Sequence, residues 1–166
     1  MAMTTLRLRR ARPEDIAFCM ATERLDGFDA VVGRWDEAVH RAALADGRHA
    51  YFLVDAGSDP MGFAIVRDWG STEQVMLLKR IAVSQPGKGL GRRFLAEIVD
   101  HAFLTTDVHR LWLGVFPENL RAQQSYRAVG FVAEGVARGS AYFGGIHRDE
   151  LIMSILRTDW TPRVKP

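Results

Sequence analysis

The spacing of hydrophobic side chains changes along the chain, and each spacing predicts one kind of element. Residues 4–10 alternate between leucines and arginines, which is the period of a half-buried strand. Six more strands are predicted from apolar runs bounded by turn-forming residues, at 50–56, 61–69, 74–83, 109–116, 131–138 and 148–156. The pattern therefore indicates a protein rich in strands.

Helical spacing of hydrophobic residues predicts four helices between these strands. Pro13 suits the first position of a helix, and Ile16 and Cys19 then lie on one face of it. The other three helices are predicted at residues 35–45, 89–105 and 119–130. Trp35 is expected on the apolar face of the second helix, and Gly130 is the stop signal of the last.

The order of these elements indicates an α/β fold, with a mixed sheet of about seven strands flanked by about four helices. The strands between residues 50 and 83 are expected to form an antiparallel meander, and the strand-helix-strand unit at 74–116 to be right-handed and parallel. A length of 166 residues with 48% hydrophobic and 25% charged side chains is typical of one globular domain. We expect a single domain over residues 1–166, with its core at about 4–158.

Composition and charge exclude several classes of protein and leave the partner open. Cys19 is the only cysteine, so no internal disulfide is possible, and a buried thiol is the expected role rather than a nucleophile. The arginine-rich start has no apolar signal segment, and no apolar run approaches the ~20 residues that span a bilayer. We therefore expect a cytoplasmic protein without a membrane partner. The net charge of +2 is too small to indicate nucleic acid.

No spacing of histidine, cysteine and acidic residues indicates a metal site. His109 and His147 lie beside arginines at the edges of predicted strands, and structural roles are expected for both.

A glycine-rich loop, SQPGKGLGRR, joins the strand that ends at Val83 to the next helix. Glycine lets the main chain approach an anion closely, and the free amides of a helix N-terminus carry partial positive charge. The loop therefore predicts a phosphate-binding site, with a turn that binds no ligand as the simpler alternative. A Walker loop does not fit, because Gly89 rather than serine or threonine follows Lys88, and the glycine spacing differs from a dinucleotide fingerprint.

A second motif, ENLRAQQSYRAVGF, begins about 28 residues after the glycine loop. Asn119 and Tyr126 are seven residues apart, so on a helix they face within roughly 20° of the same direction. Periodicity alone favours a helix cap for Asn119 and a core position for Tyr126.

Together, PGKGLG at 86–91, the preceding LLKRIAV and the second motif resemble the GCN5-related N-acetyltransferases (GNAT), which transfer acetyl from acetyl-CoA to amines. The chain looks most like the branch that contains ribosomal-protein N-terminal and diamine acetyltransferases. The resemblance implies a mostly antiparallel, twisted sheet with one parallel, splayed pair of strands. One departure is Pro86, which stands where the family usually has glutamine or arginine.

The resemblance also implies acetyl-CoA as cosubstrate and direct attack by the amine in a ternary complex. The implied coenzyme-binding residues are Ile81, Ala82, Val83, Gly87, Lys88, Gly89, Leu90, Gly91, Arg92, Asn119 and Tyr126. Tyr126 is the expected catalytic acid for the leaving thiolate, because a pKa near 10 keeps a tyrosine protonated at neutral pH.

The sequence offers several candidates for the general base and for the acceptor site. The strand VMLLKRIAV carries no acid, so Glu73 is the nearest candidate base, with Glu23 and Asp149 as further candidates; solvated surface positions are the simpler expectation for all three. Acidic and aromatic side chains favour a cationic amine. Glu23, Phe28 and Trp35 are therefore the predicted substrate-binding residues, although a solvated loop explains them equally well.

The acceptor is expected to be a small amine or a peptide N-terminus. Many GNAT proteins are dimers, so the resemblance also allows a homodimer. Two other functions remain open: a non-catalytic acyl-CoA-binding or regulatory module, indicated by the missing acid on the strand, and a nucleotide-binding enzyme.

Overall fold

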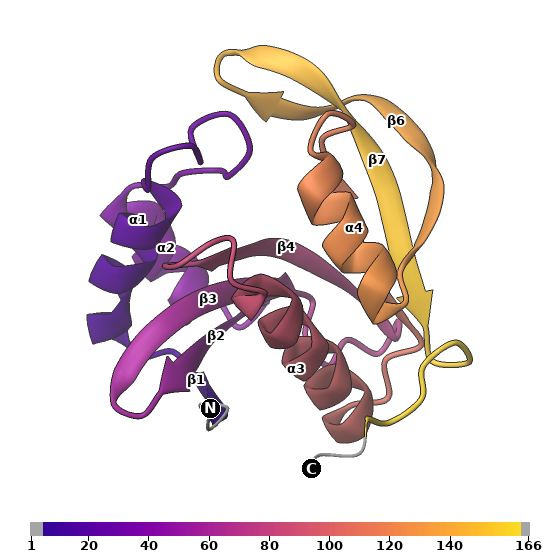
Figure 1. Cartoon of the computed structure of the whole chain (residues 1–166), viewed down its shortest axis with the longest axis horizontal. Coiled ribbons are helices and arrows are strands. Elements are labelled where there is room, and N and C mark those ends of the chain that lie inside the picture. Colours follow the sequence, from indigo (N-terminus) through magenta and orange to yellow (C-terminus); the bar gives the residue numbers. More distant parts are fainter. Residues whose placement is uncertain (1–4, 164–166) are drawn as a thin grey trace.

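A computed structural model describes residues 5–163, and all seven strands lie in one sheet (Figure 1). The strand order is β1-β2-β3-β4-β5-β7-β6. The strands are β1 (Leu6–Arg10), β2 (His49–Ala56), β3 (Asp59–Arg67), β4 (Val75–Val83), β5 (Arg110–Val115), β6 (Val132–Phe143) and β7 (Ile146–Leu156). The helices are α1 (Ile16–Glu23), α2 (Glu37–Ala45), α3 (Leu90–Thr105) and α4 (Leu120–Val129), and a 3-10 turn at Pro13–Asp15 leads into α1.

This element order confirms the predicted mixed sheet with four helices. Thr4, the first residue of the predicted first strand, lies outside the described residues. The second helix begins later than predicted, at Glu37, because the Asp36 side chain accepts a hydrogen bond from the Val39 amide at 2.9 Å and caps it. Trp35 therefore lies in the loop before α2 and not on its apolar face.

The last hairpin is longer than predicted, since β6 reaches Phe143 and β7 begins at Ile146. The predicted strands stopped at 138 and began at 148 because residues 139–145 contain three glycines, which indicate a turn. In the structure Gly144 and Gly145, with φ of 61° and 82°, make the turn itself. Gly139 lies instead in a bulge between the Ala137 and Ala141 pairings.

Helices cover both faces of the sheet, and alternate side chains of the central strands point to one face or the other. Phe52, Val54, Ala64 and Val66 pack in the cluster that includes α3. The residues between them pack in a second cluster with Cys19 of α1 and Ala43 of α2. Because both faces are covered, β2 and β3 are apolar along nearly their whole length.

The parallel pair β4 and β5 separates soon after it begins. Only Val75, Met76 and Leu77 pair with β5, whereas β4 continues to pair with β3 up to Val83. The splayed pair implied by the resemblance is thus present. It leaves one edge of β4 at residues 78–83 without a neighbouring strand.

Packing continues past residue 158, where the sequence analysis expected the core to end. The Trp160 ring lies 5.2 Å from the Phe103 ring of α3, and its indole nitrogen donates to Asp100 at 2.8 Å. Arg163 binds the same carboxylate at 2.6 Å. Within residues 5–163, no helix has the length and apolar character needed to cross a membrane.

Candidate active site

The glycine loop adopts a backbone that only glycine takes up readily at two positions. Gly87 has a φ of 90° and Gly89, the N-cap of α3, a φ of 74°. Within residues 5–163, the amides from Gly87 to Arg92 donate no backbone hydrogen bond, whereas the Arg93 amide donates to the Gly89 carbonyl at 3.2 Å. The loop therefore presents a run of free donors at the start of a helix, where the helix dipole favours an anion.

A cavity of about 700 Å³ opens beside this loop, and we call it the loop cavity. Nine of the predicted coenzyme-binding residues line it: Ile81, Ala82, Val83, Gly87, Gly89, Gly91, Arg92, Asn119 and Tyr126. The other two do not. Leu90 is buried in the hydrophobic core, and Lys88 donates to the Gln85 side chain at 3.2 Å on the surface.

Arg121 is a cation of the loop cavity that the sequence analysis missed. It lies on α4, and its Nη2 would be 3.5 Å from a Cβ at Gly87. Its guanidinium therefore reaches the loop from the opposite wall of the cavity. Only its position two residues after Asn119 hinted at this role, because the contact depends on how α4 packs beside α3.

Asn119 and Tyr126 line the same cavity, as their spacing predicted. Asn119 caps α4, since its Oδ1 accepts from the Ala122 amide at 3.2 Å. The Tyr126 hydroxyl has no hydrogen-bond partner among residues 5–163, and burial raises the pKa of Tyr126 to about 12. The phenol thus stays neutral and is a free donor toward the cavity.

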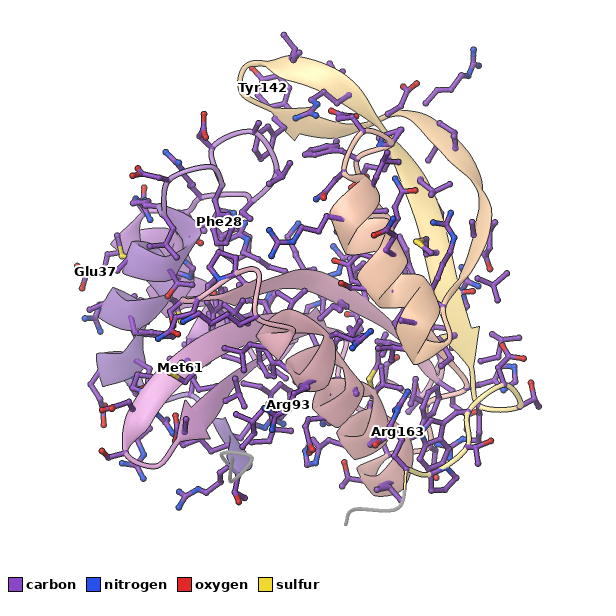
Figure 2. The ribbon with its side chains drawn as sticks, in the orientation of Figure 1. Phe28, Glu37, Met61, Arg93, Tyr142 and Arg163 are labelled. Atoms are coloured by element: carbon purple, nitrogen blue, oxygen red, sulfur yellow. The ribbon has the colours of Figure 1, made fainter. Side chains whose placement is uncertain are left out.

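A second cavity of about 560 Å³ lies against the β6–β7 hairpin, and we call it the hairpin cavity. Its walls come from the α1–α2 loop, β4, β5 and the hairpin, whose Tyr142 is marked in Figure 2 together with Phe28 of the loop. Val31, Val32, Ile81, Asn119 and Tyr126 line both cavities. The two cavities therefore meet where β4 and β5 splay apart, and Tyr126 lies at the junction.

Residues 17–131 match the family described as the acetyltransferase (GNAT) family. The chain belongs to this family. The splayed strands, the free loop amides and the tyrosine at the junction all lie within the matched residues.

Curated relatives of this GNAT chain are N-acetyltransferases. It is 30% identical over 97 residues to the probable N-acetyltransferase YjcK of Bacillus subtilis, a match that covers 58% of the chain and 52% of that relative. It is 31% identical to a spermidine N(1)-acetyltransferase of Vibrio cholerae over 50% of the chain and 48% of that protein. The [ribosomal protein uS5]-alanine N-acetyltransferase of Escherichia coli is 29% identical over 56% of the chain and 48% of that protein. The chain thus spans about half the length of these relatives.

Solved structures share the fold over nearly its whole length. The V. cholerae spermidine N-acetyltransferase in complex with CoA and spermine superposes with a TM-score of 0.79 at 22% identity, covering 93% of this chain and 96% of that one. A mutant of the same enzyme superposes with a TM-score of 0.77 at 22% identity, covering 92% of this chain and 94% of that one.

The three predicted substrate-binding residues lie in different places. Trp35 lines the hairpin cavity, whereas Phe28 lines the loop cavity. Glu23 lines neither, because it is fully buried at the end of α1. The expectation of a solvated Glu23 is therefore wrong.

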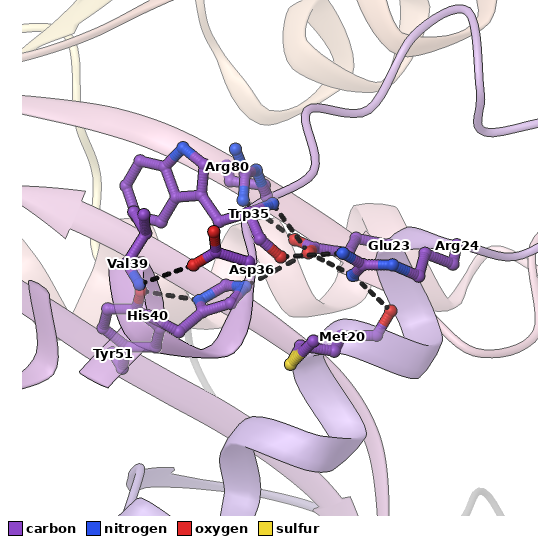
Figure 3. A network of polar contacts seen from close by, with 9 residues as sticks. All are labelled: Met20, Glu23, Arg24, Trp35, Asp36, Val39, His40, Tyr51 and Arg80. Atoms are coloured by element: carbon purple, nitrogen blue, oxygen red, sulfur yellow. Dashed lines mark hydrogen bonds and ion pairs between the residues drawn. The ribbon is translucent and has the colours of Figure 1, made fainter. Parts of the chain in front are cut away.

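Glu23 is the centre of a buried polar network (Figure 3). Its carboxylate accepts from His40 Nε2 at 3.1 Å, from the Trp35 amide at 3.0 Å and from Arg80 at 2.8 Å. Burial by itself would raise the pKa of Glu23, but the hydrogen bonds from His40 and Trp35 and the charge of Arg80 hold it below its ordinary value. The network fixes Trp35 and Arg80, which both line the hairpin cavity.

Neither of the other candidate bases reaches the cavities. Glu73 is exposed at the start of β4, about 30 Å along the strand from the glycine loop. Glu73 was chosen because it is close in sequence to the strand that leads to the glycine loop. The two ends of an extended strand lie far apart, so this closeness does not bring Glu73 near the loop. Asp149 is exposed and accepts from the Gly139 amide at 2.8 Å, which stabilises the hairpin bulge.

Two carboxylates do line the hairpin cavity: Asp29 of the α1–α2 loop and Glu150 of β7, which the sequence analysis did not single out. Its neighbour Asp149 was chosen instead, but the alternation of β7 turns the two side chains to opposite sides. The register of β7 in the sheet, which the sequence pattern does not predict, decides which acid faces the cavity.

Cys19, His109 and His147 line neither cavity. Cys19 is fully buried, and burial raises the pKa of its thiol to about 12, which is unsuited to a nucleophile. His147 is exposed beside the Tyr142 ring, and His109 is exposed at the start of β5. Across residues 5–163, no three histidine, cysteine or acidic side chains form a group that could hold a metal ion.

Proposed function

We propose that this protein transfers an acetyl group from acetyl-CoA to a primary amine. The supporting observation is the junction itself: an anion-binding loop, a free strand edge and a neutral tyrosine line one cavity, and that tyrosine also lines a second. Such an arrangement suits two substrates that must meet at one reacting bond.

The coenzyme fits the loop cavity by the chemistry of its parts. The free amides of residues 87–92 suit the pyrophosphate, with Arg92 and Arg121 adding positive charge. The main chain of residues 81–83 has one unpaired edge, which suits the amides of the pantetheine arm. This placement directs the thioester toward Tyr126.

In the proposed reaction the amine nitrogen attacks the thioester carbonyl carbon. The new C–N bond forms, the C–S bond breaks, and the electron pair leaves on sulfur. Tyr126 donates its proton to the thiolate, and the proton lost by nitrogen returns to the phenolate through solvent. The products are an amide and free CoA thiol.

Release of free thiol from acetyl-CoA, measured across a panel of amines, tests the proposal. The panel includes a polyamine and a peptide that begins with alanine, because relatives are named for spermidine and for ribosomal alanine. Thiol release that depends on an amine supports the proposal. Tight acetyl-CoA binding without thiol release would support the acyl-CoA-binding module instead, and preferential ATP binding would support a nucleotide-binding enzyme.

The Tyr126→Phe variant tests the role of the phenol. We expect kcat to fall by about 100-fold or more, because positioned acids contribute roughly 10²–10⁴-fold. Acetyl-CoA affinity, measured by calorimetry as the control, should stay unchanged since the hydroxyl acts on the leaving sulfur. Full turnover by this variant would contradict the assignment.

We also propose a cytoplasmic location and a homodimer. The single buried cysteine suits a reducing compartment. The edge strand β6 exposes Val132 and Val136 to more than half of their area, which suits contact with a second copy. Sedimentation velocity on the purified chain tests the dimer, and fractionation of cells that express it tests the location.

A further inference from the structure

The hairpin cavity carries charges of both signs. Asp29 and Glu150 are its acids, and Arg34, Lys79 and Arg80 are its bases. Arg80 is already committed, since it binds Glu23 at 2.8 Å and lies over the Trp35 ring at 4.7 Å. The charges that face the cavity from its β4 and β7 walls are therefore those of Lys79 and Glu150.

The Glu150 carboxylate fills space that is left by the missing side chain of a glycine. A Cβ at Gly114 of β5 would lie 2.7 Å from the Glu150 Cδ, so the carboxylate fills the space that any other side chain there would take. Ser140 donates to Oε2 at 2.8 Å and fixes its orientation. Among residues 5–163, no lysine or arginine lies within ion-pair distance of Glu150, so its charge is available to a cationic group in the cavity.

A bulge in β4 determines the direction of the Lys79 side chain. Ile65 of β3 pairs with Arg80 and Val66 pairs with Leu78, which leaves Lys79 as the extra residue of a bulge. Its ammonium lies 5.7 Å from the centre of the Trp35 ring, and it has no hydrogen bond or ion pair within residues 5–163. Burial lowers the pKa of Lys79, as do the nearby Arg80 and Arg67, whereas the charge of Glu150 raises it.

Resting on the function proposed above, we propose that the acceptor is a primary amine that also carries an anionic group, with Glu150 binding its ammonium and Lys79 binding its anion. Such a molecule matches the charges of the β4 and β7 walls, and the exposed Asp29 and Arg34 of the α1–α2 loop add one charge of each sign. A polycation would face Lys79 and Arg34 with like charge, and a neutral amine would leave Lys79 without a partner.

The test measures thiol release from acetyl-CoA with matched amines that differ in one anionic group. The pairs are glycine and glycinamide, β-alanine and β-alaninamide, and phosphoethanolamine and ethanolamine, with spermidine as the polycation. We expect kcat/KM to be about 10-fold or more higher for the anionic member of at least one pair, as for a charge-assisted contact of about 1.4 kcal/mol. The carboxylate and phosphate pairs distinguish the two sources of the anion.

Three variants and one control assign the preference to the named residues. Lys79→Met should bring the ratio within the preferred pair close to 1, and Lys79→Glu should turn the preference toward spermidine. Gly114→Ala should displace the Glu150 carboxylate and raise KM for every amine while the KM for acetyl-CoA stays constant. Arg41→Met is the matched control, because Arg41 is an exposed cation paired with Glu37 on α2 and lines neither cavity.

The outcomes separate this inference from the function on which it depends. Thiol release that is equal within each pair, or fastest with spermidine, would overturn the charge assignment and leave the acetyltransferase proposal intact. A preference that persists in Lys79→Met would also overturn it. Acetyl-CoA binding with no thiol release from any amine would overturn both.

Discussion

Glu23 holds four segments of the chain together through one carboxylate. Its partners come from α2, β4, the loop before α2 and the adjacent Arg24. Since an ionised carboxylate only accepts, His40 donates through Nε2, and its Nδ1 shares a hydrogen bond of 2.9 Å with the Tyr51 hydroxyl. The network therefore satisfies each buried polar atom in turn.

Glu23→Gln should lower the free energy of unfolding by about 3 kcal/mol, because Arg80 would keep a buried charge without its counter-charge. Denaturant titration measures the change, and Glu14→Gln, at an exposed position, is the control. Equal stability of the two variants would show that Arg80 finds another partner or water.

The pKa of Tyr126 predicts how the rate depends on pH. Burial raises the pKa of Tyr126 to about 12, so the phenol is neutral and able to donate its proton, and only about 1% of it is ionised at pH 10. We expect kcat to rise with pH as the amine loses its proton and to show no fall below about pH 10. Rates at saturating substrates in a series of buffers measure this, and a descending limb at pH 8 to 9 would contradict it.

At the scale of elements, two glycines at the start of α3 look equivalent in the sequence but differ in backbone conformation. Gly89 has a φ of 74°, where an alanine costs roughly 1–2 kcal/mol. Gly91 has ordinary helical geometry, and a Cβ there would lie 3.9 Å from Val83. The backbone conformation thus matters at one position and much less at the other.

Gly89→Ala should therefore weaken acetyl-CoA binding by about 10-fold, since about 1.4 kcal/mol of strain reshapes the loop. Gly91→Ala is the matched control and should stay within about 3-fold. Calorimetry with acetyl-CoA measures both. Equal losses would mean that the space in front of the loop, and not its conformation, limits binding.

Elements also show where sequence reasoning succeeds and fails. The glycine loop and the Asn119–Tyr126 stripe were found because each depends on contiguous residues and on one helical period. Lys79, Arg121 and Glu150 were missed because a bulge, the packing of α4 and the register of β7 bring them to the cavities. Each of these depends on pairing between distant strands or helices, which local patterns do not encode.

For the whole molecule, the predicted fold was correct because seven strands and four helices in this order permit few arrangements. The order of strands in the sheet, with β7 between β5 and β6, places the last hairpin over the splay. Arg148 of that hairpin donates to the Ala30 carbonyl of the α1–α2 loop at 2.9 Å and also binds Glu118 before α4. Distant parts of the chain thereby enclose the hairpin cavity.

The shared wall at Tyr126 has a consequence for how turnover proceeds. In the proposed reaction the coenzyme uses the loop cavity and the amine the hairpin cavity, so neither has to leave before the other arrives, and no acyl group has to be stored on the protein between two half-reactions. Double-reciprocal plots should then intersect rather than run parallel, and a dead-end analogue of the amine should leave the occupancy of CoA unaffected.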